Sequence, residues 1–239
     1  MGKCIKSLLG GGSLGERFSV VECEHTDDPN EKLKDCGIFI LAVKPQSFVE
    51  LAAKINIDLS DKLAISIMAG VSIASLQEKL KMKKVVRTLP NLALKIGKSF
   101  TPWVAADVLS LAERIFVKDL LRAFGDEMEV KGEDDIVAVG AMSGCGPAYF
   151  AYIAEQIKKS AISHGFSSEE AEKIANVTFV GSAEFLENEG ISPEELRAKV
   201  ASKGGSTEAA FRVMEGGGLG EIFLEGIEAA IKRTKELGK

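Results

Sequence analysis

The chain has 239 residues, enough for one large domain or two of ordinary size, and 46% of them are hydrophobic. A formal net charge of -5 with scattered lysines argues against nucleic-acid binding, which requires a basic surface. The four cysteines form no C-x-x-C pair and only two histidines are present, so we expect reduced thiols, a cytoplasmic protein and no metal site. No apolar run approaches the length of a membrane span, and the N-terminus does not resemble a signal peptide.

Near the N-terminus, a glycine-rich segment lies between a helical and a strand-like pattern. Residues 10–15 read GGGSLG and formally match the G-x-G-x-x-G dinucleotide fingerprint. That fingerprint requires a strand before it and a helix after it. Here helix-like residues come first and the strand-like run FSVVECE, residues 18–24, follows. We therefore interpret residues 10–15 as a loop that connects a helix to a strand.

Strand and helix patterns alternate from residue 36 to about residue 131. The apolar runs CGIFILAV (36–43) and LAISIM (63–68) are typical of strands that are buried on both faces of a parallel sheet. Further strands are expected at residues 84–88, 99–104 and 127–131, and helices at 47–55, 72–80 and 107–124. Ser75 and Glu78 have the spacing of a capping box. The alternation predicts a doubly wound α/β domain over residues 1–132.

From residue 133 onward the pattern is helical throughout. Helices are expected at residues 134–142, 148–163, 168–186, 193–201, 207–214 and 219–235. We therefore predict an all-α domain over residues 133–239. Several of these helices have wide apolar faces, which favour burial at a subunit interface, although a thick internal core would give the same pattern.

Two glycine-containing turns stand out in this helical half. In MSGCGPAY, residues 142–149, the helical period stops and Pro147 is suited to the first turn of a new helix. Such a junction is either an anion site at a helix N-terminus or a tight connection without a ligand. In ASKGGSTE, residues 201–208, adjacent glycines permit positive φ and a carboxylate cradle of N–H groups. As structure alone, that second turn is a C-cap followed by an N-cap.

Together with EGGGL at residues 215–219, these turns resemble those of the pyrroline-5-carboxylate reductase family. The helical domain of that family has an SGSGPAY-like turn, an SPGGTT-like loop and a GG-L motif, in this order. The sequences LAVKPQ (41–46) and LPN (89–91) are also similar to strand-end motifs of the family. The resemblance covers nearly all of the chain from residue 35, with Cys145 and Lys203 as mild departures from the usual serine and proline.

The first residues depart further from the family pattern. Family members begin with a strand and a G-x-G-N-M-G-like turn, and residues 1–3 look like the end of that turn. A second gap falls between residues 24 and 35. The resemblance therefore implies a truncated Rossmann-like domain whose N-terminal nucleotide-binding region is incomplete or degenerate. Two alternatives stay open, an active reductase and a catalytically impaired paralogue that binds small acids or oligomerises.

The family activity is the last step of proline biosynthesis. The resemblance implies an NAD(P)H-dependent oxidoreductase that reduces the C=N bond of 1-pyrroline-5-carboxylate to give L-proline. The choice between NADPH and NADH stays open, as does the size of the oligomer beyond a dimer. A different imine reductase or a β-hydroxyacid dehydrogenase is disfavoured because both helical turns match the proline enzyme. The implied partners are the small-molecule substrate and a second subunit that binds through the C-terminal helices, with no nucleic acid and no membrane.

The family motifs also assign roles to individual residues. The catalytic residue would be Thr207, with its hydroxyl beside the ring nitrogen. The substrate-binding residues would be Met142, Ser143, Gly144, Ser202, Gly204, Gly205, Ser206 and Thr207, with the N–H groups of residues 204–207 on the carboxylate. The cofactor-binding residues would be Gly2, Ala42, Val43, Lys44, Pro45 and Asn91. Without the resemblance, Lys44 would be a solvated head on an apolar stem and Asn91 a turn residue.

Overall fold

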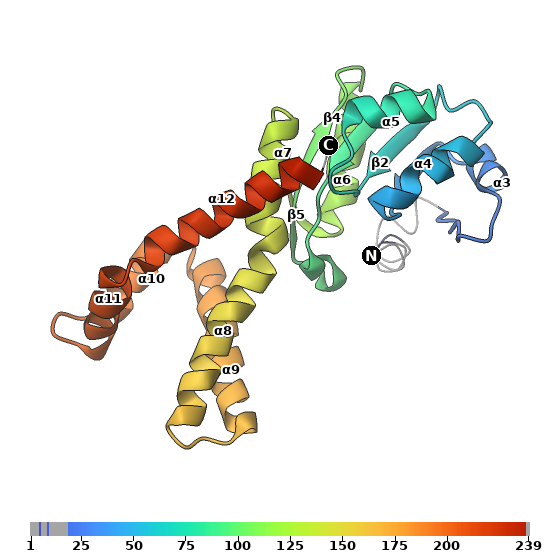
Figure 1. Cartoon of the computed structure of the whole chain (residues 1–239). Helices are drawn as coiled ribbons and strands as arrows, with labels where there is room; N and C mark the ends of the chain where they lie inside the picture. Colours follow the sequence, from blue (N-terminus) through green and yellow to red (C-terminus); the bar gives the residue numbers. More distant parts are fainter. Residues whose placement is uncertain (1–4, 6–8, 10–18, 238–239) are drawn as a thin grey trace. The chain divides into compact units, whose positions relative to one another are not determined.

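The structure of the chain is a computed structural model that describes Ile5, Leu9 and residues 19–237 (Figure 1). The chain forms two compact units. The sheet unit contains residues 1–147 and 229–239, and the helical unit contains residues 148–228. The compact units separate after Pro147, whereas the sequence predicted a domain boundary after residue 132. That predicted boundary stays a prediction.

The sheet unit contains five strands with connecting helices. Its elements are α3 (Pro29–Lys34), β1 (Ile38–Leu41), α4 (Pro45–Lys54), β2 (Leu63–Ser66), α5 (Ile73–Leu80), β3 (Val85–Thr88), η1 (Leu92–Ile96), β4 (Ser99–Ala105), α6 (Leu111–Arg122), β5 (Gly125–Glu129), α7 (Glu133–Val139) and the π-helix η2 (Gly140–Gly144). The strand order is β1-β2-β3-β4-β5. Strands β1, β2 and β3 are parallel, β4 is antiparallel to β3, and β5 is parallel to β4. This Rossmann-like arrangement confirms the predicted α/β fold class.

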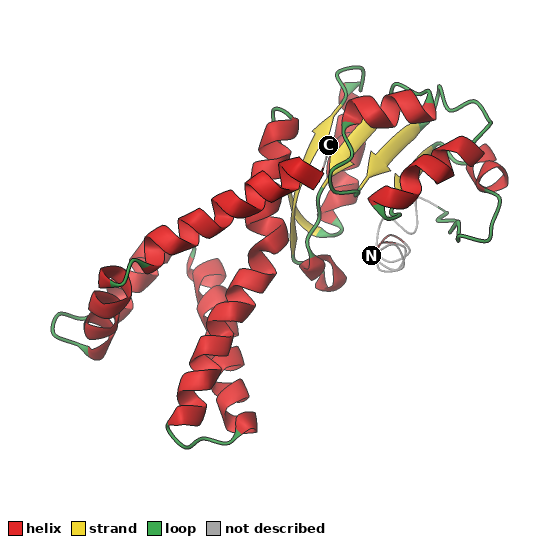
Figure 2. Ribbon diagram, in the orientation of Figure 1, coloured by secondary structure: helices red, strands yellow, loops and turns green. Residues whose placement is uncertain are grey.

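Helices cover both faces of the sheet, because neighbouring residues of its central strands join different cores (Figure 2). Leu63 and Ile65 of β2 pack in the same cluster as Val117 and Leu121 of α6. Ala64, between them, packs in the cluster that contains residues of α4 and α5. The alternation follows from the two-residue period of a strand. The prediction that strand 36–43 is buried on both faces is only partly right, since most of β1, at the sheet edge, is half-buried.

The strand predicted at residues 18–24 is wrong over its described part, because residues 19–24 form no strand. A turn follows instead, in which the Glu24 N–H donates to Asp27 Oδ2. A lone extended segment is not stable without a neighbouring strand to receive its backbone hydrogen bonds. The short helix α3 was not predicted, although Asp28 caps it and Pro29 occupies its first turn. The expected helix over residues 1–9 and the loop at 10–15 lie largely outside the described residues.

Two helix starts differ from the prediction. The cap of α5 is Ser72, whose Oγ accepts the N–H of Ser75, so the predicted Ser75–Glu78 capping box is wrong. Ser75 lies inside the first turn and uses its own N–H for that bond. Helix α6 begins at Leu111, four residues later than predicted, because Ser110 and Glu113 form a capping box there. The sequence contains both signals, but several candidate caps compete within one turn.

The predicted break at residues 142–147 is also wrong, because helix is continuous from Glu133 to Ser163. Helix α7 leads into η2, and η2 leads directly into α8 (Cys145–Ser163). The glycines are accommodated by a π-bulge, and the free helix N-terminus expected there is not formed. By length and composition alone, Glu133–Ser163 is long and apolar enough to cross a membrane, contrary to the sequence-based expectation. A helix that packs in a soluble oligomer meets the same criterion.

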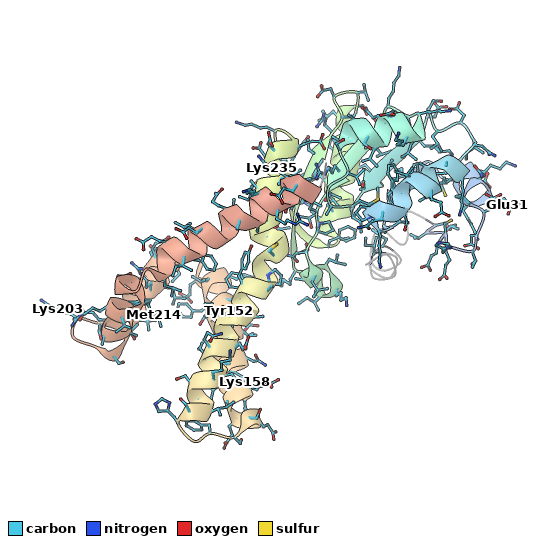
Figure 3. All side chains as sticks on the ribbon, in the orientation of Figure 1. Glu31, Tyr152, Lys158, Lys203, Met214 and Lys235 are labelled. Carbon is cyan, nitrogen blue, oxygen red and sulfur yellow. The ribbon has the colours of Figure 1, made fainter. Side chains whose placement is uncertain are left out.

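The helical unit is formed mainly by α8, α9 (Ser168–Glu189), α10 (Pro193–Val200), α11 (Ser206–Gly216) and α12 (Leu219–Leu237). Helices α8 and α9 lie side by side in Figure 1 and are joined by an ion pair between Lys158 and Glu172, with 2.7 Å between Nζ and Oε2. Figure 3 labels Lys158 and Tyr152 on α8. The predicted caps are confirmed, since Ser167 with Glu170 and Ser192 with Glu195 each form a capping box.

Candidate active site

The carboxyl ends of β1, β2 and β3 meet at one edge of the sheet, because these three strands are parallel. This edge brings together the segments that follow β1 and β3, which contain the predicted cofactor residues Ala42, Val43, Lys44, Pro45 and Asn91. Residues 42–45 are exposed, and Lys44, in extended conformation, is the N-cap of α4. Ligands of open α/β sheets bind beyond this kind of edge. Gly2, also predicted at the cofactor, lies outside the described residues.

The segment after β2 belongs to the same edge and was not predicted as part of the site. Met68 is buried, Ala69 is exposed, and Gly70 has φ +78°. Because β2 lies between β1 and β3, this segment lies between the two predicted ones. The available signal was the apolar strand LAISIM ending at Ala69-Gly70, which parallels the end of β1 at Lys44-Pro45.

Asn91 is buried and makes three hydrogen bonds at this edge. Its Oδ1 accepts the Ala93 N–H at 2.9 Å, which caps η1. Its backbone N–H donates to Ser99 Oγ at 3.0 Å. Its Nδ2 donates to the carbonyl oxygen of Ser143 at 3.0 Å. Asn91 thus joins the end of β3 to the π-helix η2, so the structure brings together one predicted cofactor residue and one predicted substrate residue.

Three predicted substrate residues, Met142, Ser143 and Gly144, lie in η2. Met142 and Gly144 are exposed and Ser143 is half-buried. The Ser143 Oγ atom itself is buried, and it has no hydrogen-bond partner within the described residues. A buried hydroxyl without a partner costs free energy, which makes Ser143 a candidate for contact with a ligand.

An ion pair between a buried arginine and a half-buried glutamate was not predicted. Arg87 of β3 donates from Nη1 to Oε1 of Glu133, the first residue of α7, over 2.8 Å. The same carboxylate oxygen accepts the N–H of Ile73, the first residue of α5, at 3.0 Å. Only 5% of the Arg87 side chain is exposed. Glu133 therefore ties together a strand and two helix starts, and no local sequence signal indicates this pairing.

The remaining predicted substrate residues lie in the helical unit, in the loop from α10 to α11. Gly204 has φ +75°, a conformation that glycine adopts without strain. A Cβ added to Gly205 would lie 2.6 Å from Ser202 Oγ and 3.0 Å from the Ser202 carbonyl oxygen, so a side chain there would require Ser202 to shift. Lys203 is exposed in this loop and is labelled in Figure 3.

Two of the four N–H groups expected to hold a carboxylate already have partners. The Gly204 N–H donates to Glu208 Oε2 at 2.6 Å, and the Gly205 N–H donates to the Ser202 carbonyl at 2.9 Å. Gly205 is the N-cap of α11, which has no side-chain cap. Ser206 and Thr207 follow as the first two residues of α11, and Thr207 is half-buried. The N–H groups at the first turn of a helix are directed outward and favour an anion.

Metal-binding side chains do not cluster in the described part of the chain, where no group of three or more His, Cys, Asp or Glu residues could hold a metal ion. The thiol of Cys145 is half-buried and unpaired. The polar groups at the described site residues are backbone amides, hydroxyls, the ammonium of Lys44 and the carboxamide of Asn91. Such groups bind and orient a reactant.

Comparison with known proteins places these features in one family. The family model for pyrroline-5-carboxylate reductase dimerisation matches residues 133–237. A pyrroline-5-carboxylate reductase from Corynebacterium melassecola is 33% identical over 234 residues, which are 96% of this chain and 85% of the relative.

Two solved structures resemble the whole fold. The pyrroline-5-carboxylate reductase of Coxiella burnetii is 31% identical with a TM-score of 0.81, covering 90% of this chain and 80% of that one. The Plasmodium falciparum pyrroline carboxylate reductase, solved with NADP bound, is 26% identical with a TM-score of 0.80, covering 91% and 85%. Sequence, fold and site motifs agree, and the chain belongs to the pyrroline-5-carboxylate reductase family.

Proposed function

We propose that this protein reduces 1-pyrroline-5-carboxylate to L-proline with NADPH or NADH. The observation that carries the proposal is the start of α11, where a glycine turn leaves two backbone amides uncapped beside the hydroxyl of Thr207. A small ring that carries a carboxylate and an imine nitrogen matches these groups, because amides bind the anion and the hydroxyl can pair with the nitrogen. Family membership supports the same substrate.

The substrate carboxylate is held by the N–H groups of Ser206 and Thr207. This assignment is narrower than the expected cradle of residues 204–207, because the Gly204 and Gly205 N–H groups already have partners. The hydroxyl of Thr207 forms a hydrogen bond with the ring nitrogen and orients the C=N bond. Ser202, Gly204 and Gly205 shape the loop, and Met142, Ser143 and Gly144 provide a second binding segment, which we propose to come from the other subunit of the dimer.

The sheet edge provides the nicotinamide side of the site. The residues proposed there are Ala42, Val43, Lys44 and Pro45, and their exposed segment leaves room for a planar ring. A bound reduced nicotinamide supplies the hydride for the imine carbon. The chain's own residues bind and orient the two reactants, and an imine that arrives protonated requires no dedicated acid.

The protein acts as a homo-oligomer, and a homodimer formed by the C-terminal helices is the smallest assembly that we propose. The match of residues 133–237 to the family's dimerisation model supports this assembly. The exposed apolar faces of the helical unit support it as well, because a soluble protein does not leave such faces in water. We propose a cytoplasmic location for this enzyme.

A titration followed by an assay tests this function. The protein is titrated with NADPH and NADH by fluorescence, and cofactor oxidation is then measured with 1-pyrroline-5-carboxylate. Saturable binding with turnover is expected, and Thr207→Ala should lower kcat/KM by about 100-fold, the effect of losing an orienting hydrogen bond in the transition state. The control is Thr178→Ala, an exposed threonine of the same unit. Proline binding without cofactor binding or turnover would instead indicate a catalytically impaired paralogue.

A further inference from the structure

The Ser143 carbonyl lacks the donor that an α-helix normally provides. In an α-helix the N–H of residue i+4 donates to the carbonyl of residue i. Residue 147 stands at this position relative to Ser143, and it is a proline without an N–H. The Nδ2 of Asn91 donates to the same carbonyl at 3.0 Å. Asn91 therefore supplies, from the loop after β3, a hydrogen bond that Pro147 cannot make.

The carboxamide of Asn91 is held in one orientation. Its Oδ1 is fixed by the Ala93 N–H, so its NH2 group is directed toward η2. Its backbone is fixed in turn by Ser99 Oγ, which lies 3.0 Å from Thr101 Oγ1. Ser99 and Thr101 are buried, and Asn91 is 9% exposed. A side chain with this many fixed contacts is suited to positioning a neighbour.

The π-helix is also fixed at its other end. A Cβ added to Gly140 would lie 2.7 Å from Leu89 Cδ1, so η2 packs closely against the residue that follows β3. Leu89 and Asn91 thus hold Gly140 and Ser143, the first and fourth residues of η2. These two contacts hold the backbone of η2 on both sides of Met142, and so hold the Cα of Ser143, whose hydroxyl has no partner within the described residues.

We propose that Asn91 is a positioning residue that acts through the Ser143 carbonyl rather than through contact with the cofactor. It holds η2 so that the Ser143 hydroxyl meets the bound substrate. This proposal rests on the proposed function, and it replaces the family-based expectation that Asn91 binds the cofactor. The substrate-side helix and the cofactor-side strand end then depend on one side chain.

The test uses the full-length protein and the variant Asn91→Asp. Aspartate retains the Oδ1 acceptor for Ala93 but places a carboxylate against the Ser143 carbonyl. We expect kcat/KM for 1-pyrroline-5-carboxylate to fall about tenfold or more, mainly through KM. We expect the dissociation constant for NADPH to stay within about twofold, since a positioning role leaves cofactor binding unchanged. The control is Ser72→Ala, which removes the cap of α5 and should change neither quantity.

Hydrogen exchange of residues 140–146 gives a readout that does not depend on activity. Asn91→Asp should speed this exchange about tenfold, and Ser72→Ala should not. Adding Pro147→Ala, which restores an N–H four residues after Ser143, should return much of the protection. If Asn91→Asp does not fold, Asn91→Ser, which retains an acceptor for the Ala93 N–H, carries the same predictions.

Each outcome decides the proposal. Cofactor affinity that falls as much as kcat/KM, with unchanged exchange, would show that Asn91 contacts the cofactor and would overturn the inference. If Asn91→Asp and Ser72→Ala have the same kcat/KM and the same hydrogen exchange of residues 140–146, Asn91 acts only as a helix cap. That result would also overturn the inference. A wild-type protein without turnover would refute the proposed function. In that case, faster exchange of residues 140–146 in Asn91→Asp would still support the inference that Asn91 holds η2. Unchanged exchange would refute that inference.

Discussion

In the sheet unit, Leu76, Val85, Val117 and Leu121 are completely buried, and they belong to clusters with many other buried side chains. In the helical unit, the buried residues are two small ones, Ala171 and Ala175. Its large apolar side chains remain half-buried or exposed. The sheet unit therefore builds a core from its own residues, whereas the helical unit, as one copy, does not.

This difference shows that the two units are stabilised differently. Helices with unburied apolar faces gain little from packing on their own, since most helix stability comes from tertiary contacts. The family's dimerisation model matches residues 133–237, which supports our proposal that a second copy of the chain covers these faces. The proposed oligomer would also account for the apolar character of Glu133–Ser163, which meets a membrane-span criterion by length and composition. Oligomer formation and folding of the helical unit are then coupled.

The largest expected effect comes from charging the apolar face of α9. Val177 and Val180 are 63% and 52% exposed in one copy. The double substitution Val177→Glu/Val180→Glu should abolish the oligomer and lower activity about 1000-fold, because each unpaired carboxylate costs several kcal/mol when a partner covers it. Sedimentation and steady-state assays measure both effects. Val49→Glu on α4, at 60% exposure, is the matched control, and equal oligomer formation by all variants would contradict the comparison.

Dilution of the protein should distinguish stability that comes from a unit's own core from stability that comes from oligomer formation, with a smaller expected effect. Leu76→Ala in α5 should lower the free energy of unfolding of the sheet unit by about 3 kcal/mol at every protein concentration, because it opens a cavity in a closed core. Leu224→Ala in α12, where the side chain is 65% exposed, should matter increasingly as the protein is diluted. Urea unfolding at several concentrations measures both. If the loss in free energy of unfolding depends on protein concentration in the same way for both variants, the two units are not stabilised differently.

The buried ion pair of the sheet unit gives the next effect. Glu133→Gln leaves the Arg87 guanidinium buried without its counter-charge, which should lower the free energy of unfolding by about 2 kcal/mol. Glu78→Gln removes an exposed partner of Lys79 and should cost no more than a few tenths of a kcal/mol. Urea unfolding compares them. Equal effects of the two substitutions would argue against a structural role for the Arg87–Glu133 pair.

The smallest effect depends on pH. Hydrogen bonds from Lys84 and from the Ser110 cap lower the pKa of Glu113 from 4.5 to about 2. A carboxyl group whose pKa is lower in the folded state stabilises the protein above its unfolded pKa and loses this contribution as pH falls through the folded pKa. Glu113→Gln should therefore cost about 1 kcal/mol at pH 7. The difference from wild type should shrink between pH 4.5 and about 2, and urea unfolding that shows a constant difference would contradict it.

Much of the fold was predictable because its signals are local. The runs around Ile65 and Val86 are short, apolar and β-branched, as buried strands require, and Ser192 followed by Pro193 marks a helix start. The strand predicted at residues 18–24 was wrong over residues 19–24, which pair with no strand among the described residues. The break before Pro147 was wrong because a π-helix carries the chain through the glycines, and no local pattern shows that Asn91 donates to the Ser143 carbonyl there.

The site residues themselves stay predictions, and the sequence proposes them only where motifs mark them. The residues after β1 and the loop before α11 carry family motifs, and the structure places the first at a sheet edge and the second at a helix start. The segment of Met68 and Gly70, the Arg87–Glu133 pair and the engaged Gly204 N–H depend on contacts that no local pattern contains. Such contacts are decided by packing, which a single sequence does not reveal.

The most direct test of the proposed reductase is to follow the hydride. Wild-type protein is incubated with 1-pyrroline-5-carboxylate and NADPH that carries deuterium at the transferable position, and the proline is analysed by mass spectrometry and NMR. We expect proline with deuterium at the former imine carbon, in equal amount to the cofactor oxidised and strongly reduced in Thr207→Ala. Cofactor oxidation without labelled proline, or no reaction with either NADPH or NADH, would contradict the assignment.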